Sequence, residues 1–209
     1  MDRRAVLSFA LLLSAASLTS CAPRLIPVAG PDTQIDSRTR AVAKTQGAIT
    51  VTVRLEAWDY PPTELPRHVL PLLVTIQNGR TDEITFSRQN LTLLDDKRRQ
   101  IASLTPEAVI ASFGGGAGSG VYPSVGVGAA GPSPTVFGIG LGISFGGERN
   151  VQEILTRALA EGAIRAGAQG EGFLYFAPPA ADAQSLTLLL SLLTPAGKTE
   201  WEFLFRFTK

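Results

Sequence analysis

The sequence predicts a mainly β protein, an antiparallel β-sandwich that carries a helix, a glycine-rich loop and a second helix as an insertion. Three observations lead to this fold class. Short segments alternate apolar and polar residues, as strands do when one face is buried and the other meets water. Turn residues separate most of these segments. An uncharged, glycine-rich stretch at residues 114–147 lies between two helix-like segments.

The first two predicted strands lie on either side of residue 60. In residues 49–57 the odd positions are apolar and the even ones polar, which predicts a half-buried strand. Residues 69–77 form the next predicted strand, with aliphatic side chains at alternate positions. Pro71 near its start indicates an edge or a bulge, because proline donates no backbone hydrogen bond. Asn78-Gly79 then predicts a turn.

The middle of the chain predicts shorter elements. Short strands are expected at residues 83–87, 91–94 and 100–104, with a turn at 95–98. Thr105 then predicts a helix cap, with Pro106 at the first helical position. This helix is expected to end near Phe113, because three glycines follow it.

The last third of the chain predicts a helix and then strands. Residues 149–161 have one apolar stripe, and Gly162 is placed to end that helix. The stripe consists of Val151, Ile154, Leu155, Ala158 and Leu159. Two apolar strands are predicted at 172–177 and 185–193. In the final strand four aromatic side chains share one face, which predicts a central place in the sandwich; they are Trp201, Phe203, Phe205 and Phe207.

The N-terminus has the pattern of an export signal that ends at a cysteine. Arg3 and Arg4 precede an uncharged apolar run, which is shorter than the roughly 20 residues of a membrane span. Leu18-Thr19-Ser20-Cys21 follows, and Cys21 is the sole cysteine of the chain. This stretch resembles the lipobox of bacterial lipoproteins. The resemblance implies diacylglycerol on the Cys21 sulfur, cleavage just before Cys21, and acylation of the new amino group with a fatty acid such as palmitate.

These observations predict three parts. Residues 1–20 are expected to be a lipoprotein signal peptide, residues 21–46 a lipidated cysteine with a flexible tether, and residues 47–209 the sandwich domain. An alternative for the tether is that part of it packs along the domain. The strand pattern also resembles uncharacterised bacterial lipoproteins built on an immunoglobulin-like sandwich, although the Cys…Trp…Cys spacing of true immunoglobulin domains is absent.

Composition excludes several classes of function. Without residues 1–20 the chain has 189 residues with 17 basic and 17 acidic side chains, a net charge of zero, so no nucleic-acid partner is expected. No disulfide is possible when Cys21 carries lipid. With one histidine and one cysteine far apart, we expect no metal site, no cofactor and no Cys/His catalytic pair.

Residues 114–147 contain 13 of the 21 glycines and no charged residue. Two arms alternate glycine with an apolar residue, which predicts a hairpin at 121–146 with one bare face. The apolar side chains proposed for membrane or partner contact are Phe137, Ile139, Leu141, Ile143 and Phe145. Ordering so many glycines costs more backbone entropy than a free hairpin recovers. The open alternatives are a surface loop, a hairpin docked on its own domain, or a hairpin that contacts a membrane or another copy.

Few residues are candidates for binding or catalysis. Trp58 and Tyr60, beside two prolines, suit a ligand surface that stacks on sugars or peptides, or else they cap the end of a sandwich core. Asp95 and Asp96 suit either a cation or a solvated turn. His68 has no evident catalytic partner in the sequence. The glycine repeats lack the strand, G-x-G-x-x-G and helix order of a nucleotide site.

The sequence therefore predicts a lipid-anchored cell-envelope protein with a non-catalytic binding or structural role. Its expected partners are the membrane, through the lipid, and an envelope protein or polymer. Ala22 follows the cysteine in place of the Asp that resembles an inner-membrane retention signal. For a Gram-negative source this implies the outer membrane, facing the periplasm. The alternative is a membrane-active or self-assembling protein that uses residues 121–146, and the third possibility is an envelope hydrolase.

Overall fold

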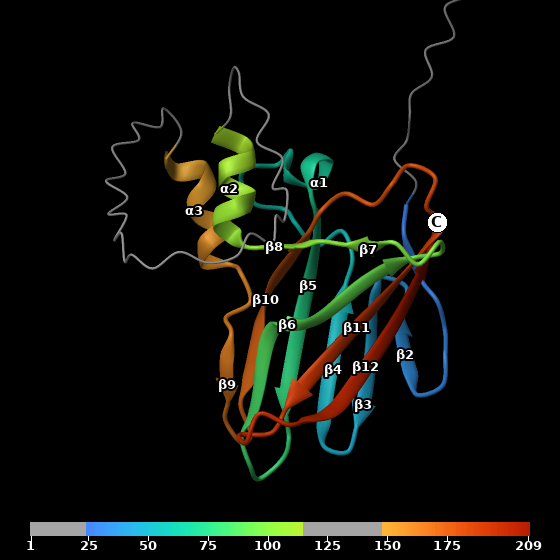
Figure 1. Cartoon of the computed structure of the whole chain (residues 1–209), viewed down its shortest axis with the longest axis vertical. Helices are drawn as coiled ribbons and strands as arrows, with labels where there is room; N and C mark the ends of the chain where they lie inside the picture. Colours follow the sequence, from blue (N-terminus) through green and yellow to red (C-terminus); the bar gives the residue numbers. More distant parts are fainter. Residues whose placement is uncertain (1–23, 115–147) are drawn as a thin grey trace, which may run out of the picture.

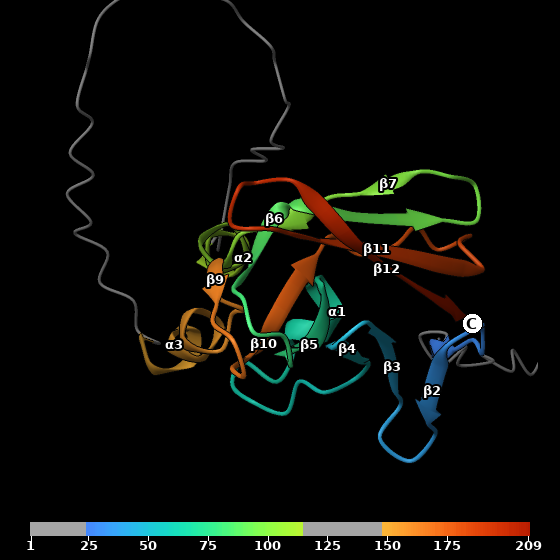
Figure 2. The same ribbon diagram turned by 90° about the horizontal axis from the view of Figure 1, so that it is seen from below.

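The computed structural model describes residues 24–114 and 148–209, which form two antiparallel sheets packed face to face (Figures 1 and 2). The first sheet has the order β1-β12-β11-β6-β7, with β9 also paired to β6. Its strands are β1 Ile26–Pro27, β6 Ile84–Asp95, β7 Gln100–Ile101, β9 Gly162–Ile164, β11 Ser185–Leu193 and β12 Thr199–Thr208. The predicted mainly β, antiparallel, sandwich-like architecture is confirmed.

The second sheet has the order β2-β3-β4-β5-β10-β8. Its strands are β2 Thr33–Asp36, β3 Ala41–Gln46, β4 Ile49–Arg54, β5 Leu70–Asn78, β8 Ser103–Leu104 and β10 Gln169–Phe176. Alternation explains how the two sheets meet, because every second side chain of a strand points to the same face. In β4, for example, Ile49, Val51 and Val53 are buried and the residues between them are partly exposed.

The inter-sheet core is aliphatic with a few large aromatic side chains. Its fully buried members include Ile49, Leu72, Ile76, Ile84, Phe86, Leu93, Phe176, Phe203, Phe205 and Phe207. The predicted face of the final strand is confirmed, since Trp201, Phe203, Phe205 and Phe207 are all buried. The predicted central place of β12 is wrong: one neighbour is the long β11, but the other is β1, which has two residues. Side-chain alternation reports burial and says nothing about the order of strands.

The predicted strands 83–87 and 91–94 are one continuous strand, β6. Its pairing with β11 shifts register, because Leu190 lies opposite Leu91 whereas Leu192 lies opposite Phe86. Three more residues are therefore taken up by β6 than by β11 at this point. The irregularity interrupts the alternation, and that interruption produced the expectation of two short strands.

The predicted strand 100–104 is divided between the sheets. Gln100–Ile101 (β7) pairs with β6 in the first sheet, and Ser103–Leu104 (β8) pairs with β10 in the second. The chain crosses at Ala102, whose carbonyl accepts a hydrogen bond of 2.9 Å from Ala177 N. This crossing places the next helix at one end of the sandwich.

Pro71 lies where β5 has a partner on one side only. β10 reaches it, through Tyr175, whereas the pairing with β4 ends at Leu73. The expectation of a local edge at Pro71 is therefore confirmed.

Residues 24–46 differ from the expected flexible tether. β1 pairs with β12, and β2 and β3 extend the second sheet beyond β4. Leu25 is buried in the inter-sheet core. Prolines and glycines made this stretch look irregular, but they lie between short strands. Pairing with the distant β12 defines β1, and a hairpin on β4 defines β2 and β3. The alternative, that part of the stretch packs along the domain, holds for the described residues.

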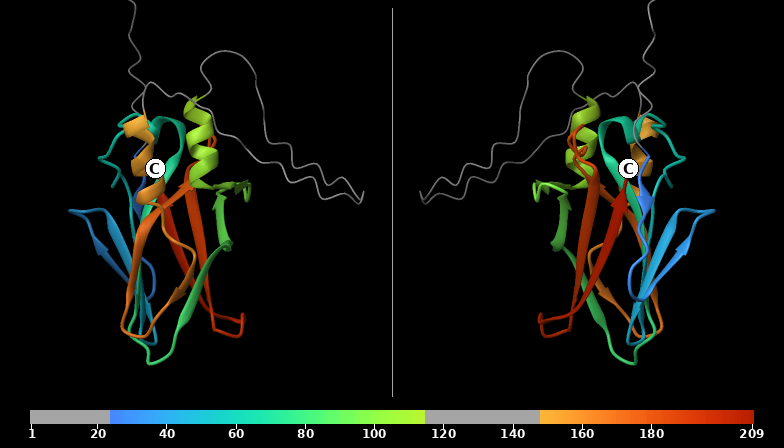
Figure 3. Two further views of the ribbon diagram at one scale, coloured as in Figure 1. Left: turned by 90° about the vertical axis from the view of Figure 1, so that its left-hand side faces the viewer. Right: turned by 90° about the vertical axis from the view of Figure 1, so that its right-hand side faces the viewer.

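Three helices gather at one end of the sandwich (Figures 1 and 3): α1 Leu65–His68, α2 Pro106–Gly114 and α3 Glu148–Thr156. The predicted cap of α2 is present, with Ala108 N donating to Thr105 Oγ1 at 3.2 Å.

α3 is shorter than the predicted 149–161, because the chain after it pairs with β10. Phe173 N donates to Arg157 O at 2.7 Å, and Leu159 N donates to Phe173 O at 2.9 Å. Of the predicted stripe, Leu155 is exposed and Leu159 joins the inter-sheet core. No helix within the described ranges has the length and apolar character needed to cross a membrane.

The end of the sandwich opposite the helices is held by a buried amide. Asn78 Nδ2 donates to the carbonyls of Asp82 and Ile164, each at 2.9 Å, and Asn78 Oδ1 accepts from Arg80 N at 3.1 Å. Residue 79 has no room for a side chain. A Cβ there would lie 2.6 Å from the carbonyl oxygen of Ala48, the residue before β4, which explains the glycine. The predicted turn at Asn78-Gly79 is therefore also the point where three connections meet.

Candidate functional site

Trp58 and Tyr60 belong to a second apolar cluster, on the outer side of the second sheet beneath the helices. We call it the helical-end cluster; its buried members are Ala57, Trp58, Leu65, Val69, Val109, Ile154, Phe173 and Tyr175. Trp58 is buried, and its Nε1 donates to Pro62 O at 3.0 Å. Its ring meets Phe173 edge-on with 4.9 Å between ring centroids. Trp58 therefore presents little surface to a ligand in this conformation.

Tyr60 lies at the rim of the helical-end cluster and is partly exposed. The guanidinium carbon of Arg157 lies 3.5 Å from the centre of the Tyr60 ring, a cation–π contact. Arg157 Nε also donates to Glu153 Oε2 at 2.6 Å. Sequence reasoning missed Arg157, since no local pattern links residue 60 to residue 157. The partly exposed Tyr60, together with Arg157, is the part of the predicted Trp58–Tyr60 surface that a partner can reach.

Tyr175 fixes α3 to the second sheet. Its hydroxyl donates to Ile154 O at 3.0 Å, one of the carbonyls that the end of a helix leaves without a helical partner. Ala158 N, which would be that partner in a longer helix, donates to Leu155 O instead. Burial raises the pKa of the Tyr175 hydroxyl well above its ordinary value, so the group stays protonated as a donor.

The two acidic residues considered for a cation hold turns. Asp95 is buried: its Oδ1 accepts from the backbone N–H groups of Lys97 and Arg99, at 2.9 and 2.8 Å, and its Oδ2 from Arg99 Nε at 2.6 Å. Burial tends to raise the pKa of Asp95, but the hydrogen bonds from Arg99 outweigh burial and lower it. Asp96 Oδ1 accepts from Gln184 N at 2.8 Å.

Asp182 connects this turn to the connection between β10 and β11. It forms ion pairs with Lys97 and with Arg99, the latter at 2.7 Å. The Lys97 ammonium and then the Arg99 guanidinium hold the pKa of Asp182 well below its ordinary value.

Within the described residues, no group of three or more His, Cys, Asp or Glu side chains is arranged to hold a metal ion. His68 lies in α1 and is exposed.

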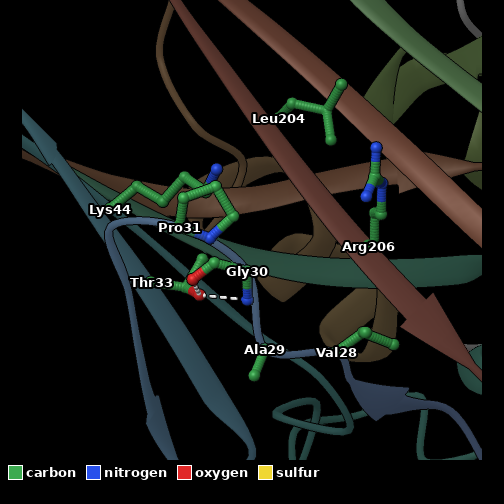
Figure 4. A pocket seen from close by; sticks show the side chains of 8 residues that line it. All are labelled: Val28, Ala29, Gly30, Pro31, Thr33, Lys44, Leu204 and Arg206. Atoms are coloured by element: carbon green, nitrogen blue, oxygen red, sulfur yellow. Dashed lines mark hydrogen bonds between the residues drawn. The ribbon is translucent and has the colours of Figure 1, made fainter.

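A hollow of about 170 Å³ lies between the N-terminal segment and β12 (Figure 4). It is lined by Val28, Ala29, Gly30, Pro31, Thr33, Lys44, Leu204 and Arg206. Lys44 and Arg206 bring positive charge, and Val28 and Leu204 bring exposed apolar surface. Sequence reasoning missed this hollow because it treated residues 28–33 as tether. Every lining residue is at least partly exposed, so the hollow is shallow.

The other predicted contact residues lie outside the described ranges. These are the lipidation residue Cys21 and the apolar residues of the glycine-rich stretch, Phe137, Ile139, Leu141, Ile143 and Phe145. The structure describes the helices on either side of that stretch, α2 and α3, which pack against each other.

Comparison with known proteins gives two distant structural similarities. The sequence matches no family model and no curated protein. The yjhA protein from Bacillus subtilis aligns with a TM-score of 0.41 and 13% identity over 78% of this chain and 93% of that one. The protein ycdA from Bacillus subtilis subsp. subtilis str. 168, named a putative lipoprotein, aligns with a TM-score of 0.38 and 14% identity over 77% of this chain and 37% of that one. Neither similarity assigns a function to this chain.

Proposed function

We propose that this chain is a lipid-anchored cell-envelope protein whose sandwich has a non-catalytic binding or structural role. The observation that carries the proposal is where the fold begins. Leu25 is buried and Ile26 pairs with Thr208, only four and five residues after Cys21. Cleavage just before Cys21 would therefore leave every described strand intact. For a Gram-negative source, the residue after the cysteine, Ala22, supports the outer membrane, facing the periplasm.

We also propose that the sandwich is immunoglobulin-like. The strand order β4-β5-β10-β8 in one sheet and β6-β11-β12 in the other supports this. Labelled in chain order, these strands have the A-B-E-D and C-F-G arrangement of immunoglobulin constant domains. On this assignment β1, β2, β3, β7 and β9 are additions at the sheet edges. An experimental structure with a different connection between β6 and β10 would contradict the assignment.

Three acidic side chains of the domain are used structurally. They are Asp95, Asp96 and Asp182, which accept hydrogen bonds from backbone N–H groups or basic side chains that join two turns. An envelope hydrolase, the third possibility, would have to use other groups for proton transfer. Incubation of the purified protein with peptidoglycan tests it, and release of soluble fragments would overturn the non-catalytic role.

The anchor itself is tested by the mature N-terminus. In the wild-type protein, mass spectrometry should find an acylated N-terminal residue at Cys21. Cys21→Ser should abolish acylation and processing at this site, and the protein should leave the membrane fraction. A matched variant, Ser20→Ala, keeps the cysteine and should be processed as the wild type. An unmodified thiol at Cys21, or cleavage elsewhere, would contradict the proposal.

The alternative function, a membrane-active or self-assembling protein, uses residues 121–146. The observation that supports it is that α2 and α3, the described helices on either side of the stretch, contact each other, as the two ends of a hairpin require. To test it, residues 115–147 are replaced by a short polar linker in the chain 22–209 without lipid. If the stretch contacts membrane or another copy, only the intact chain should float with liposomes or form larger species on sizing. Identical behaviour in both assays would reject this alternative.

A further inference from the structure

We propose that one end of the sandwich faces the lipid bilayer, and we call it the anchor end. It consists of Arg24, the β2–β3 turn 37–40, the connection 177–184, the helices and the C-terminus. Figure 1 shows the helices and the C-terminus at this end. The opposite, distal end consists of the turns 47–48, 79–83, 165–168 and 194–198. The inference rests on the proposed function, since it takes lipid on Cys21 as the attachment to the membrane.

The chain between the lipid and the fold is too short to let the domain turn freely. Two residues, Ala22 and Pro23, separate Cys21 from Arg24. Three Cα–Cα steps of 3.8 Å span at most about 11 Å. A flexible tether of 25 residues would have allowed a distance of roughly 25–30 Å between the lipid and the domain. Because residues 24–46 form strands of the domain, that distance is much shorter than the sequence led us to expect.

Arg24 is itself held in place. Its Nε donates to both carboxylate oxygens of Glu56, at 3.2 and 3.1 Å, and Arg40 from the β2–β3 turn pairs with the same carboxylate. The residues that follow are fixed more firmly: Leu25 is buried, and Val28 N donates to Arg206 O at 2.8 Å. The exit point of the chain is therefore defined by β12 and by Glu56.

The two ends of the sandwich are well separated. β11 runs from the connection 177–184 to the turn 194–198, and its nine residues span about 30 Å at roughly 3.4 Å per residue. A bilayer within about 11 Å of Arg24 can touch the anchor end while the distal turns remain in water. The surface at the anchor end adds one apolar side chain, since Ile26 is 55% exposed. Its turns expose the basic residues Arg38 and Arg98 as well as the acidic residues Asp96 and Asp182. The orientation is therefore argued from the short connection to the lipid, with Ile26 as an apolar contact that suits a lipid surface.

The orientation can be measured with single thiols, because Cys21 is the sole cysteine and its sulfur carries the lipid. Four exposed alanines give matched positions: Ala111 and Ala181 at the anchor end, Ala166 and Ala196 at the distal end. Each full-length Ala→Cys variant is labelled with a fluorophore. It is then reconstituted in phosphatidylethanolamine–phosphatidylglycerol vesicles that contain lipids with a nitroxide on the headgroup.

We expect the labels at residues 111 and 181 to be quenched roughly threefold more than those at 166 and 196, because about 30 Å separates the ends. Equal quenching at all four positions, or stronger quenching at the distal pair, would overturn the inference. A fifth label, at Thr187→Cys on the outer face of the first sheet, tests the orientation in which that sheet lies flat on the membrane. If that label is quenched most, the sheet lies flat on the membrane and the inference is wrong.

Two controls separate this inference from the proposed function. Mass spectrometry of each variant shows whether Cys21 is acylated, and absence of acyl groups would overturn the proposed function itself. Insertion of ten Gly/Ser residues between Pro23 and Arg24 keeps the lipid but adds roughly 17 Å of flexible chain. This insertion should reduce the difference between the two ends. If a clear difference persists unchanged, the short connection is not what orients the domain.

Discussion

The inter-sheet core and the helical-end cluster exclude water by different means. Between the sheets, the buried side chains are nearly all aliphatic or phenylalanine and need no polar partner. At the helical end, the indole of Trp58 and the hydroxyl of Tyr175 each donate to a backbone carbonyl, of Pro62 and Ile154 respectively. The first core depends on burial alone, whereas the second depends on burial and on hydrogen bonds that join distant segments.

The two regions also differ in how their residues are spaced. The inter-sheet core uses every second residue of long strands, such as β12. The helical-end cluster takes single residues from a loop, three short helices and one face of β10. Loss of one contact should therefore weaken the first region in proportion to the apolar volume removed. In the second region, it should loosen the attachment of a whole element, such as α3.

Phe205→Ala gives the largest expected effect, because it tests the region that depends on burial alone. Phe205 is fully buried, so we expect a loss of roughly 3–5 kcal/mol in the free energy of unfolding. The control is the adjacent Leu204→Ala, which should cost clearly less because Leu204 is 36% exposed. Denaturant melts of the chain without lipid measure both. Equal losses would contradict the burial of one face of β12 and the exposure of the other.

Gly172→Ala tests the place where the two regions meet. Gly172 lies on β10, and a Cβ there would come within 2.4 Å of Leu159 N. The backbone cannot yield easily, so we expect a loss of roughly 1–3 kcal/mol, as in overpacked interiors. The matched control is Gly170→Ala, whose Cβ would meet movable side chains in place of backbone: Ile164 at 3.2 Å and Leu159 at 3.9 Å. A variant at residue 172 that melts like the wild type would contradict the close approach of residues 158–159 to β10.

Tyr175→Phe tests the hydrogen bonds of the helical-end cluster. It keeps the ring but leaves Ile154 O without its donor, so we expect a loss of about 1–2 kcal/mol. The loss should appear as faster amide hydrogen exchange in α3, with β11 and β12 unchanged. Phe173→Leu, which removes an aromatic ring without a hydrogen bond, serves as the comparison. Unchanged exchange in α3 would show that packing alone holds the helix.

The smallest effect at neutral pH is expected from Asp182→Asn, in the ion-pair cluster with Lys97 and Arg99. The pKa of Asp182 is lower in the folded protein than its ordinary value of 3.8, so its contribution is present above pH 3.8. It is lost as the pH falls below 3.8 through the folded pKa. Thermal melts between pH 7 and pH 2 should therefore show a shallower acid decline for D182N than for the wild type. An identical decline would exclude Asp182 as a contributor.

Much of the sandwich could be predicted from local pattern. The strands 69–77, 185–193 and the final strand lie within one residue or two of β5, β11 and β12, because alternation and bounding turns report local burial. The cap of α2 was predictable for the same reason, since Thr105 and Pro106 act on the adjacent turn.

The candidate surface at Trp58 and Tyr60 was less predictable. The two residues are neighbours in sequence, yet only distant partners, Phe173 and Arg157, decide that one is buried and the other partly exposed.

The sequence by itself determined the strand faces and the turn positions, because each of these depends on residues within a few positions of one another. The export signal that ends at Cys21 is likewise a local pattern, but it remains a prediction. The tertiary structure decided the rest. It joined the two predicted strands 83–87 and 91–94 into β6, divided 100–104 between the sheets, and ended α3 early. It also placed the expected tether in β1, β2 and β3. For β1, β6, β8 and the end of α3 the deciding hydrogen bonds come from a strand far away in the chain, and the energy of such pairing has no local signature in the sequence. β2 and β3 instead form a local hairpin that continues the sheet from β4.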